Sequence, residues 1–133
     1  MTARRSRGFT LIDLSMAVAV AGVLASVALP SYQAQIARSQ RMEAITALMR
    51  LQAVQEQFRA HHGSYALQLQ ALQGVVPQGA HHQITLVAAH ANGYIARASW
   101  NGRGARDDGC SELSLSVTEG IASHGPSERC WNR

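Results

Sequence analysis

The sequence RRSRGFTLIDLS occupies residues 4–15 and decides the fold of this chain of 133 residues. A basic leader ends at Gly8, an apolar run begins at Phe9, and the fifth residue of that run is a carboxylate, Asp13. The run to Leu29 carries no other charge and would span about 30 Å as a helix, the thickness of a bilayer core. Because an acid in a membrane-length segment is costly, we expect Asp13 to have a function and a charged partner.

The net charge of +4 is unevenly distributed along the chain. All basic residues are arginines, and three of the twelve lie in the leader. Without the leader, nine arginines face eight acids, which leaves a net charge of +1. Any basic patch for nucleic acid would therefore have to be local.

The apolar segment and the two cysteines indicate an exported domain. A secretory signal is cleaved after its apolar core. Here the candidate cleavage position, Gly8, comes before the apolar segment, so we expect that segment to be retained. The arginines before the segment predict that this end faces the cytoplasm. The remainder would face the outside or the periplasm, where Cys110 and Cys130 can form one disulfide.

The run from Gly8 to Leu14 resembles the class III signal of type IV pilins and related pseudopilins. The resemblance implies that prepilin peptidase cuts after Gly8 and N-methylates Phe9. It also implies that Asp13, where the family usually has Glu, pairs with the N-terminal amine of a neighbouring subunit during assembly. The implied organisation is a leader (1–8), a membrane and filament-core helix (9–30), an amphipathic helix (31–62) and a globular head (63–133).

Apolar periodicity predicts that the helix continues to about His61, with Gly63 as its stop signal. Gly22 and Pro30 are candidate kink positions, since glycine and proline weaken a helix. We expect Arg38 and Arg41 to lie on a solvated or intersubunit face. The apolar stripe that would face the head comprises Ile45, Ala47, Leu48, Leu51, Val54 and Phe58.

The C-terminal half predicts a small antiparallel sheet of three or four strands. Residues 84–90 and 94–100 read as a hairpin around Asn92-Gly93, and alternation over 113–118 predicts a further strand. We expect the sheet to pack on the helix, because so small a sheet needs an apolar partner, and Tyr65 to contribute to packing. The resulting α+β fold is that of type IV pilins, in which the C-terminal disulfide loop is often the exposed, functional surface.

Catalysis and metal binding have little support in the sequence. Six histidines occur, two pairs among them, but no spacing typical of zinc ligands accompanies them. No nucleophile elbow, phosphate-binding loop or dinucleotide motif is present either. We therefore expect no enzymatic activity, no metal and no cofactor.

DNA binding is the more serious alternative to a purely structural role. The chain end near Cys130-Trp131 resembles the PilE-like and competence-pilin branch, whose competence members act as DNA receptors. Asp107, Asp108 and Glu112 would oppose phosphate, and packing suits Trp131 and Trp100 better than stacking on bases. DNA binding needs arginines that contact phosphates and an aromatic side chain that stacks on bases. The candidate residues are Arg97, Trp100, Arg103, Arg106 and Arg129.

The sequence thus predicts a type IV pilus subunit, and a minor pilin in particular. Its expected partners are other pilin subunits, prepilin peptidase, the inner-membrane assembly platform and the inner membrane itself before assembly into an extracellular pilus. The alternatives are a DNA-uptake receptor at the pilus surface and a type II secretion pseudopilin.

Overall fold

The computed structural model describes residues 9–72, 79–104, 106–107 and 109–131. The chain divides into two compact units, Met1–Gln33 and Ala34–Arg133, and one helix contributes residues to both. The leader, including Gly8, lies outside the described residues, and so does Asp108.

Helix α1 runs from Leu11 to His62. It begins two residues after the expected start at Phe9 and ends one residue before Gly63, as expected from the stop signal. The helix continues through Pro30, so the proline does not interrupt the helical assignment. A kink at this position stays a prediction.

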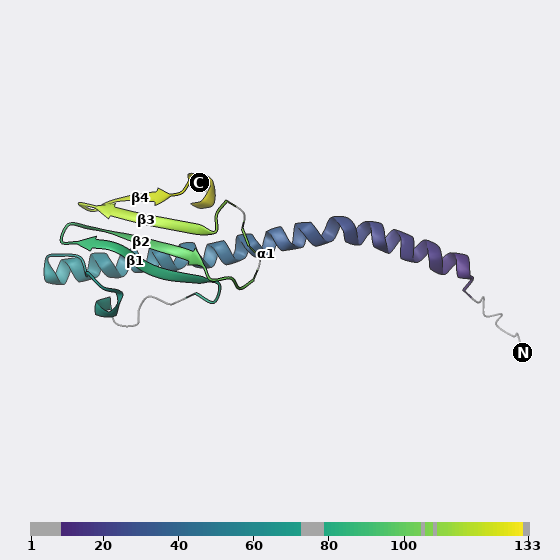
Figure 1. Ribbon diagram of the computed structural model, residues 1–133, viewed down its shortest axis with the longest axis horizontal. Coiled ribbons are helices and arrows are strands. Elements are labelled where there is room, and N and C mark those ends of the chain that lie inside the picture. Colours follow the sequence, from purple (N-terminus) through teal and green to yellow (C-terminus); the bar gives the residue numbers. More distant parts are fainter. Residues whose placement is uncertain (1–8, 73–78, 105, 108, 132–133) are drawn as a thin grey trace, which may run out of the picture. The chain divides into compact units, whose positions relative to one another are not determined.

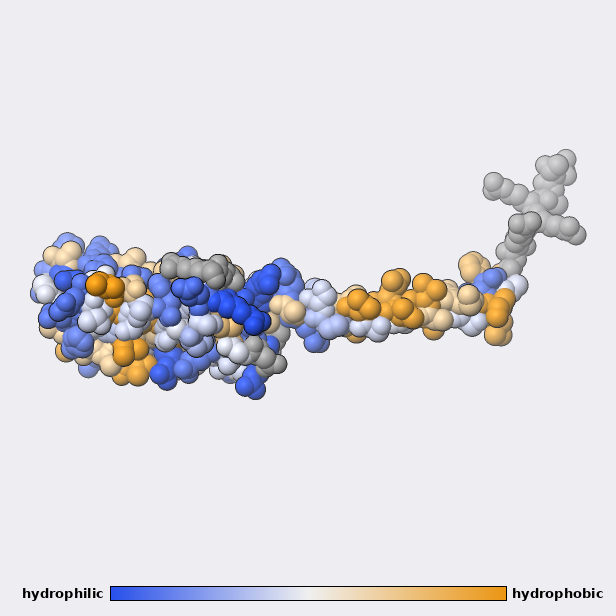
Figure 2. Space-filling model, turned by 90° about the horizontal axis from the view of Figure 1, so that it is seen from above, coloured by the Kyte–Doolittle hydropathy of each residue, from blue (hydrophilic) through white to orange (hydrophobic). Residues whose placement is uncertain are grey.

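The part of α1 in the first unit exposes its apolar side chains. Phe9 and Leu11 are almost fully exposed, and Figure 2 shows hydrophobic residues along the surface of this segment. By length and composition, α1 includes a stretch able to cross a membrane. Because water is a poor solvent for so much apolar surface, this segment needs lipid or other helices around it.

The second unit contains a four-stranded antiparallel sheet in the order β1-β2-β3-β4. The strands are β1 (His82–His90), β2 (Gly93–Trp100), β3 (Glu112–Thr118) and β4 (Ile121–Gly125). They form a meander beside the C-terminal part of α1 (Figure 1). Two short 3-10 helices, η1 (Leu69–Leu72) and η2 (Glu128–Trp131), precede and follow the sheet.

The predicted hairpin between β1 and β2 is confirmed with a shift of one residue. The two connecting residues are Ala91 and Asn92, and Gly93 already pairs with His90 in the sheet. Glycine is required there because a Cβ would lie 2.5 Å from the carbonyl oxygen of Val117 on β3. The glycine is thus needed for the close approach of β2 to β3 and not for the turn.

The fourth strand follows a tight turn at Glu119 and Gly120. Both residues have positive φ, 52° and 84°, which is the geometry of a two-residue type I′ hairpin. The Glu119 amide donates to the carbonyl oxygen of Asn92 at 2.8 Å, so the β1–β2 and β3–β4 turns are joined at one end of the sheet.

The core lies between α1 and one face of the sheet. Leu48 and Leu51 are completely buried, whereas Val54 and Phe58 lie at the margin of the core, which confirms the predicted stripe. The sheet contributes small residues in β2 and large aliphatic ones in β3, and the buried members are Ile84, Tyr94, Ala96, Ala98, Leu113, Leu115 and Val117. Tyr65 is buried in the same cluster, as predicted.

One polar side chain, Gln55, lies within this core. It is completely buried, and its amide donates to the carbonyl oxygen of Ala66 at 3.1 Å while accepting from the Ala66 amide at 2.8 Å. Both polar ends of the side chain are therefore satisfied, which removes the cost of burial. The pair fixes the chain after α1 against the helix.

Leu48→Ala should lower the free energy of unfolding of the head by about 2–5 kcal/mol, because the deleted atoms leave a cavity between helix and sheet. The measurement is denaturant or thermal unfolding of the full chain in a nonionic detergent. Gln57→Ala, on the exposed side of the same helix, is the matched control and should change stability by less than about 0.5 kcal/mol. Equal effects of both substitutions would contradict the described packing.

Candidate functional site

The N-terminal candidates form a reciprocal capping arrangement at the start of α1. The Thr10 hydroxyl and amide donate to Oδ2 of Asp13 at 2.6 and 3.1 Å. The Asp13 amide in turn donates to Oγ1 of Thr10 at 3.3 Å. This is the geometry of a capping box, with an acid at the third helical position. Within the single chain, Thr10 is thus the hydrogen-bond partner of the membrane-segment carboxylate.

Of the two candidate kink residues, Gly22 is not explained by packing. A Cβ at Gly22 would meet nothing within 4 Å, so no contact within the described chain requires glycine there. Pro30 lies inside α1. The roles of these residues stay predictions.

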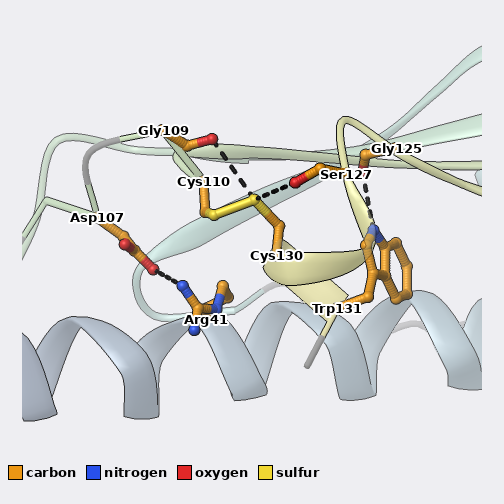
Figure 3. The surroundings of a disulfide bond; sticks show 8 residues. All are labelled: Arg41, Asp107, Gly109, Cys110, Gly125, Ser127, Cys130 and Trp131. Carbon is orange, nitrogen blue, oxygen red and sulfur yellow. Dashed lines mark hydrogen bonds and ion pairs between the residues drawn. A yellow bond between two sulfur atoms is a disulfide. The ribbon is translucent and has the colours of Figure 1, made fainter. Parts of the chain in front are cut away.

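Cys110 and Cys130 form the predicted disulfide, which joins the start of β3 to η2. Both cysteines are buried, and their Cα atoms are 5.5 Å apart (Figure 3). Trp131 lies next to them, buried, with its Nε1 donating to the carbonyl oxygen of Gly125 at 2.8 Å. Trp131 therefore packs at the end of β4.

The connection between β2 and β3 carries two exposed arginines, Arg103 and Arg106. We call its described residues, 101–104, 106–107 and 109, the arginine loop. Trp100 precedes the loop and is partly buried, and its Nε1 donates to the carbonyl oxygen of Arg103 at 2.9 Å. The indole N–H thus helps to shape the loop.

The other two arginine candidates lie outside the loop. Arg97 is on β2, half-buried, with its Nε 3.3 Å from Oε1 of Glu112 on β3. Arg129 is exposed in η2, beside Cys130. The disulfide connects η2 to the residue that follows the loop, Cys110, so it brings Arg129's segment to the end of the arginine loop.

Arg41 is a residue that the sequence reasoning placed wrongly. We expected a solvated or intersubunit face, but Arg41 is only 8% exposed, and its Nη1 forms an ion pair with Oδ2 of Asp107 in the arginine loop (Figure 3). A signal was present: Arg41 precedes Ala44, Ile45 and Leu48 by three, four and seven positions, which places it on the apolar stripe. The loop partner, 66 residues away, was not visible from the sequence.

Glu43 holds the segment that leads into β1. Its carboxylate accepts from the Ala80 amide at 2.7 Å and lies 3.0 Å from Nδ1 of His81. The hydrogen bond with His81 is the main reason that the pKa of Glu43 lies below its usual value. Next to it, burial lowers the pKa of His82.

The histidines do not gather into a metal site within the described ranges. Among residues 9–72, 79–104, 106–107 and 109–131, no group of three or more His, Cys, Asp or Glu side chains could hold a metal ion. The expectation of no metal and no cofactor stays a prediction.

The second unit, with its arginine loop, matches a known family. The family model described as type IV minor pilin ComP, DNA uptake sequence receptor, matches residues 30–114, more than half of the chain. The chain belongs to this type IV minor pilin family. The match covers β1, β2 and the first three residues of β3, together with Arg41 and the arginine loop.

Curated relatives support the same family. The chain is 42% identical over 62 residues to the type IV major pilin protein PilA of Myxococcus xanthus, over 47% of this chain and 28% of PilA. It is 55% identical over 40 residues to a fimbrial protein of Moraxella nonliquefaciens (30% of this chain, 26% of the relative). It is 41% identical over 59 residues to the type IV major pilin protein PilE1 of Neisseria gonorrhoeae (44% and 36%). The chain thus matches about a quarter to a third of the length of these relatives.

Membership of the minor pilin family confirms the predicted type IV pilin resemblance and the α+β fold. It also indicates a structural protein, and the apolar helix fits membrane anchoring and pilus assembly. The processing, assembly and DNA-binding roles predicted for individual residues stay predictions.

His82 should make the stability of this minor pilin depend on pH. Burial is the main cause of its lowered pKa; His81 adds to the shift, whereas the carboxylates of Glu43 and Asp107 oppose it. Because the folded state disfavours the protonated imidazole, stability present above the unfolded pKa of about 6.5 is lost as the pH falls below it.

The measurement is the thermal unfolding temperature of the full chain in nonionic detergent between about pH 7.5 and about pH 5. His82→Asn should reduce the loss on acidification, whereas His61→Asn, at an exposed position, should leave it unchanged. An unaltered pH dependence in His82→Asn would contradict this explanation.

Proposed function

We propose that this chain is a minor subunit of a type IV pilus, cleaved after Gly8 by prepilin peptidase and N-methylated on Phe9. The observation that carries the proposal is α1, whose first part exposes apolar side chains over a membrane-length stretch. Such a surface suits first a bilayer and then the helix-lined core of a filament. We assign the protein no enzymatic role.

The proposed topology follows from the leader and the disulfide. Arginines on the N-terminal side of the span favour a cytoplasmic N-terminus. The head would then lie in the periplasm, where the Cys110–Cys130 disulfide can form and persist. Assembly on the inner-membrane platform would transfer the head to the outside of the cell, at the pilus surface.

Asp13 is the proposed assembly residue. In the single chain its Oδ2 is hydrogen-bonded to Thr10, which lowers the cost of holding a carboxylate in lipid. After cleavage, the methylated amine of Phe9 on a neighbouring subunit supplies the opposite charge. In a low-dielectric core such a pair attracts strongly, which favours a register that brings the two termini together.

Gly8→Ala should block maturation, because the resemblance places the scissile bond directly after this glycine. In a host that carries the peptidase, the mass of the purified chain should stay that of the full precursor and no methylated Phe9 should be found. Gly22→Ala is the matched control, because a Cβ there meets nothing within 4 Å, and it should mature normally. Maturation of Gly8→Ala to the shorter chain would refute the proposed processing.

A second function, DNA reception at the pilus surface, is favoured by the arginine loop. The matched family is described as a DNA uptake sequence receptor. In this chain Arg103 and Arg106 are exposed, and Asp107, an acid expected to repel phosphate, is paired with Arg41. A phosphate that binds these arginines would therefore meet less repulsion from Asp107 than the sequence suggests. The pseudopilin alternative has no comparable supporting observation in the described chain.

The DNA proposal predicts salt-sensitive binding by the full chain in nonionic detergent. Each arginine that neutralises a phosphate contributes about −0.9 to the slope of log affinity against log salt concentration. Replacing Arg103 and Arg106 together by alanine should thus weaken duplex binding and make the slope shallower by about two. When Arg103 and Arg106 are replaced one at a time, the charge-matched control is Arg50→Ala, which removes one arginine from an exposed position of α1.

The measurement is fluorescence anisotropy of a labelled duplex at several salt concentrations. Absence of binding at low salt would refute the receptor function. Binding that the double substitution leaves unchanged would remove these two arginines from it.

A further inference from the structure

We propose that Arg41 is a positioning residue for the arginine loop, which it serves by pairing with Asp107 so that this carboxylate does not oppose DNA phosphates. The inference rests on the proposed DNA-receptor function and assigns a role to a helix residue that would not itself contact DNA.

The ion pair joins the helix to the loop at a place with little solvent. The side chains of Arg41 and Asp107 are 10% and 23% exposed, and Nη1 faces Oδ2 (Figure 3). A pair with so little contact with water is weakly screened by salt, so it persists at ionic strengths that weaken exposed pairs. Arg41 extends from α1, which makes the helix the fixed partner and the loop the segment that is held.

The neutralised carboxylate is the residue directly after Arg106. A phosphate that approaches Arg106 would meet the full negative charge of Asp107 if Arg41 were absent. With the pair formed, the two charges cancel at longer range, so Asp107 opposes a phosphate near Arg106 less than an unpaired carboxylate would. Arg41 thus affects DNA binding by neutralising Asp107 and not by contacting DNA itself.

The shape of the loop has further supports that do not depend on this pair. Nδ2 of Asn101 donates to the carbonyl oxygen of Ala80 at 2.8 Å, and the Asn101 amide donates to that of His81 at 3.0 Å. The Arg103 amide donates to Oδ1 of Asn101 at 3.0 Å. These bonds hold the first half of the loop to the segment before β1.

Gly104 brings the loop close to α1. Its φ is +84°, and a Cβ there would lie 2.4 Å from Nε2 of Gln40 and 2.8 Å from the ring of His81. Loop and helix therefore also come close at Gln40, the residue directly before Arg41. Loss of the ion pair should accordingly change the charge at the loop more than its place on the helix.

This arrangement predicts opposite effects for two substitutions that break the same pair. Both Arg41→Gln and Asp107→Asn lose the ion pair, and each should lower the unfolding temperature. Arg41→Gln leaves a negative charge beside Arg106, whereas Asp107→Asn removes it. A purely structural role would weaken DNA binding in both variants in proportion to the lost stability.

The test uses the full chain in nonionic detergent, a labelled duplex and salt concentrations from about 50 to about 200 mM. We expect Arg41→Gln to raise Kd about three- to tenfold at the lowest salt, and Asp107→Asn to leave Kd unchanged or lower it by up to about threefold. The double variant should return to within about twofold of the original chain, because the uncompensated carboxylate is gone. Arg50→Gln removes the same charge from α1 about 13 Å further along the axis, which exceeds the Debye length at salt concentrations of about 100 mM and above, and should change Kd there by less than about twofold.

Two results would overturn the inference. One is weakening of DNA binding by Asp107→Asn, a result that does not require Arg41→Gln to fold. The other is failure of the double variant to recover although its unfolding temperature shows a folded head. If the original chain itself does not bind duplex DNA at low salt, the receptor function fails together with this inference. If the original chain binds DNA but the variants give either of the two results above, only the role of Arg41 is refuted.

Discussion

The structure of the head depends on burial of one apolar face of the sheet against the apolar stripe of α1. Leu48 and Leu51 of the helix, with Leu113 and Leu115 of β3, are completely buried in this contact. A four-stranded sheet with only five residues in its last strand has too little surface to be stable without such a partner. The helix therefore supplies one side of the core.

Once the apolar contact is made, polar side chains of the same helix determine where the connections lie. Arg41 pairs with Asp107 of the arginine loop, Glu43 accepts from the Ala80 amide before β1, and Gln55 binds the backbone of Ala66. Each of these contacts reaches a segment outside the helix. The loops that would form the outer surface of a pilus are thus attached to the element that would form its core.

Local pattern was sufficient for most elements but not for all. The helix, its end near His62 and three strands follow from periodicity and turn residues, which act between neighbours in the sequence. Residues 121–125, IASHG, show weak alternation, and their strand exists because β3 offers an edge for pairing. In the candidate site, the exposed arginines were predictable, whereas the hydrogen bond from the Trp100 indole to the Arg103 carbonyl oxygen and the pairing of Arg97 with Glu112 were not. Those depend on side-chain contacts between strands and loops.

The sequence by itself determined the membrane-length helix, the disulfide partners and the family, and it predicts the processing signal, because each resides in composition or in short-range spacing. Only the tertiary structure decided that Arg41 is buried and that Asp107 is its partner, since 66 residues separate them. Folding brings them together because the apolar stripe seats β2 and β3 on α1, and the connection between these strands then meets the helix at Arg41. Asp107, which in the sequence looks like a charge that opposes the arginines of this loop, is paired in the folded chain with an arginine of the helix.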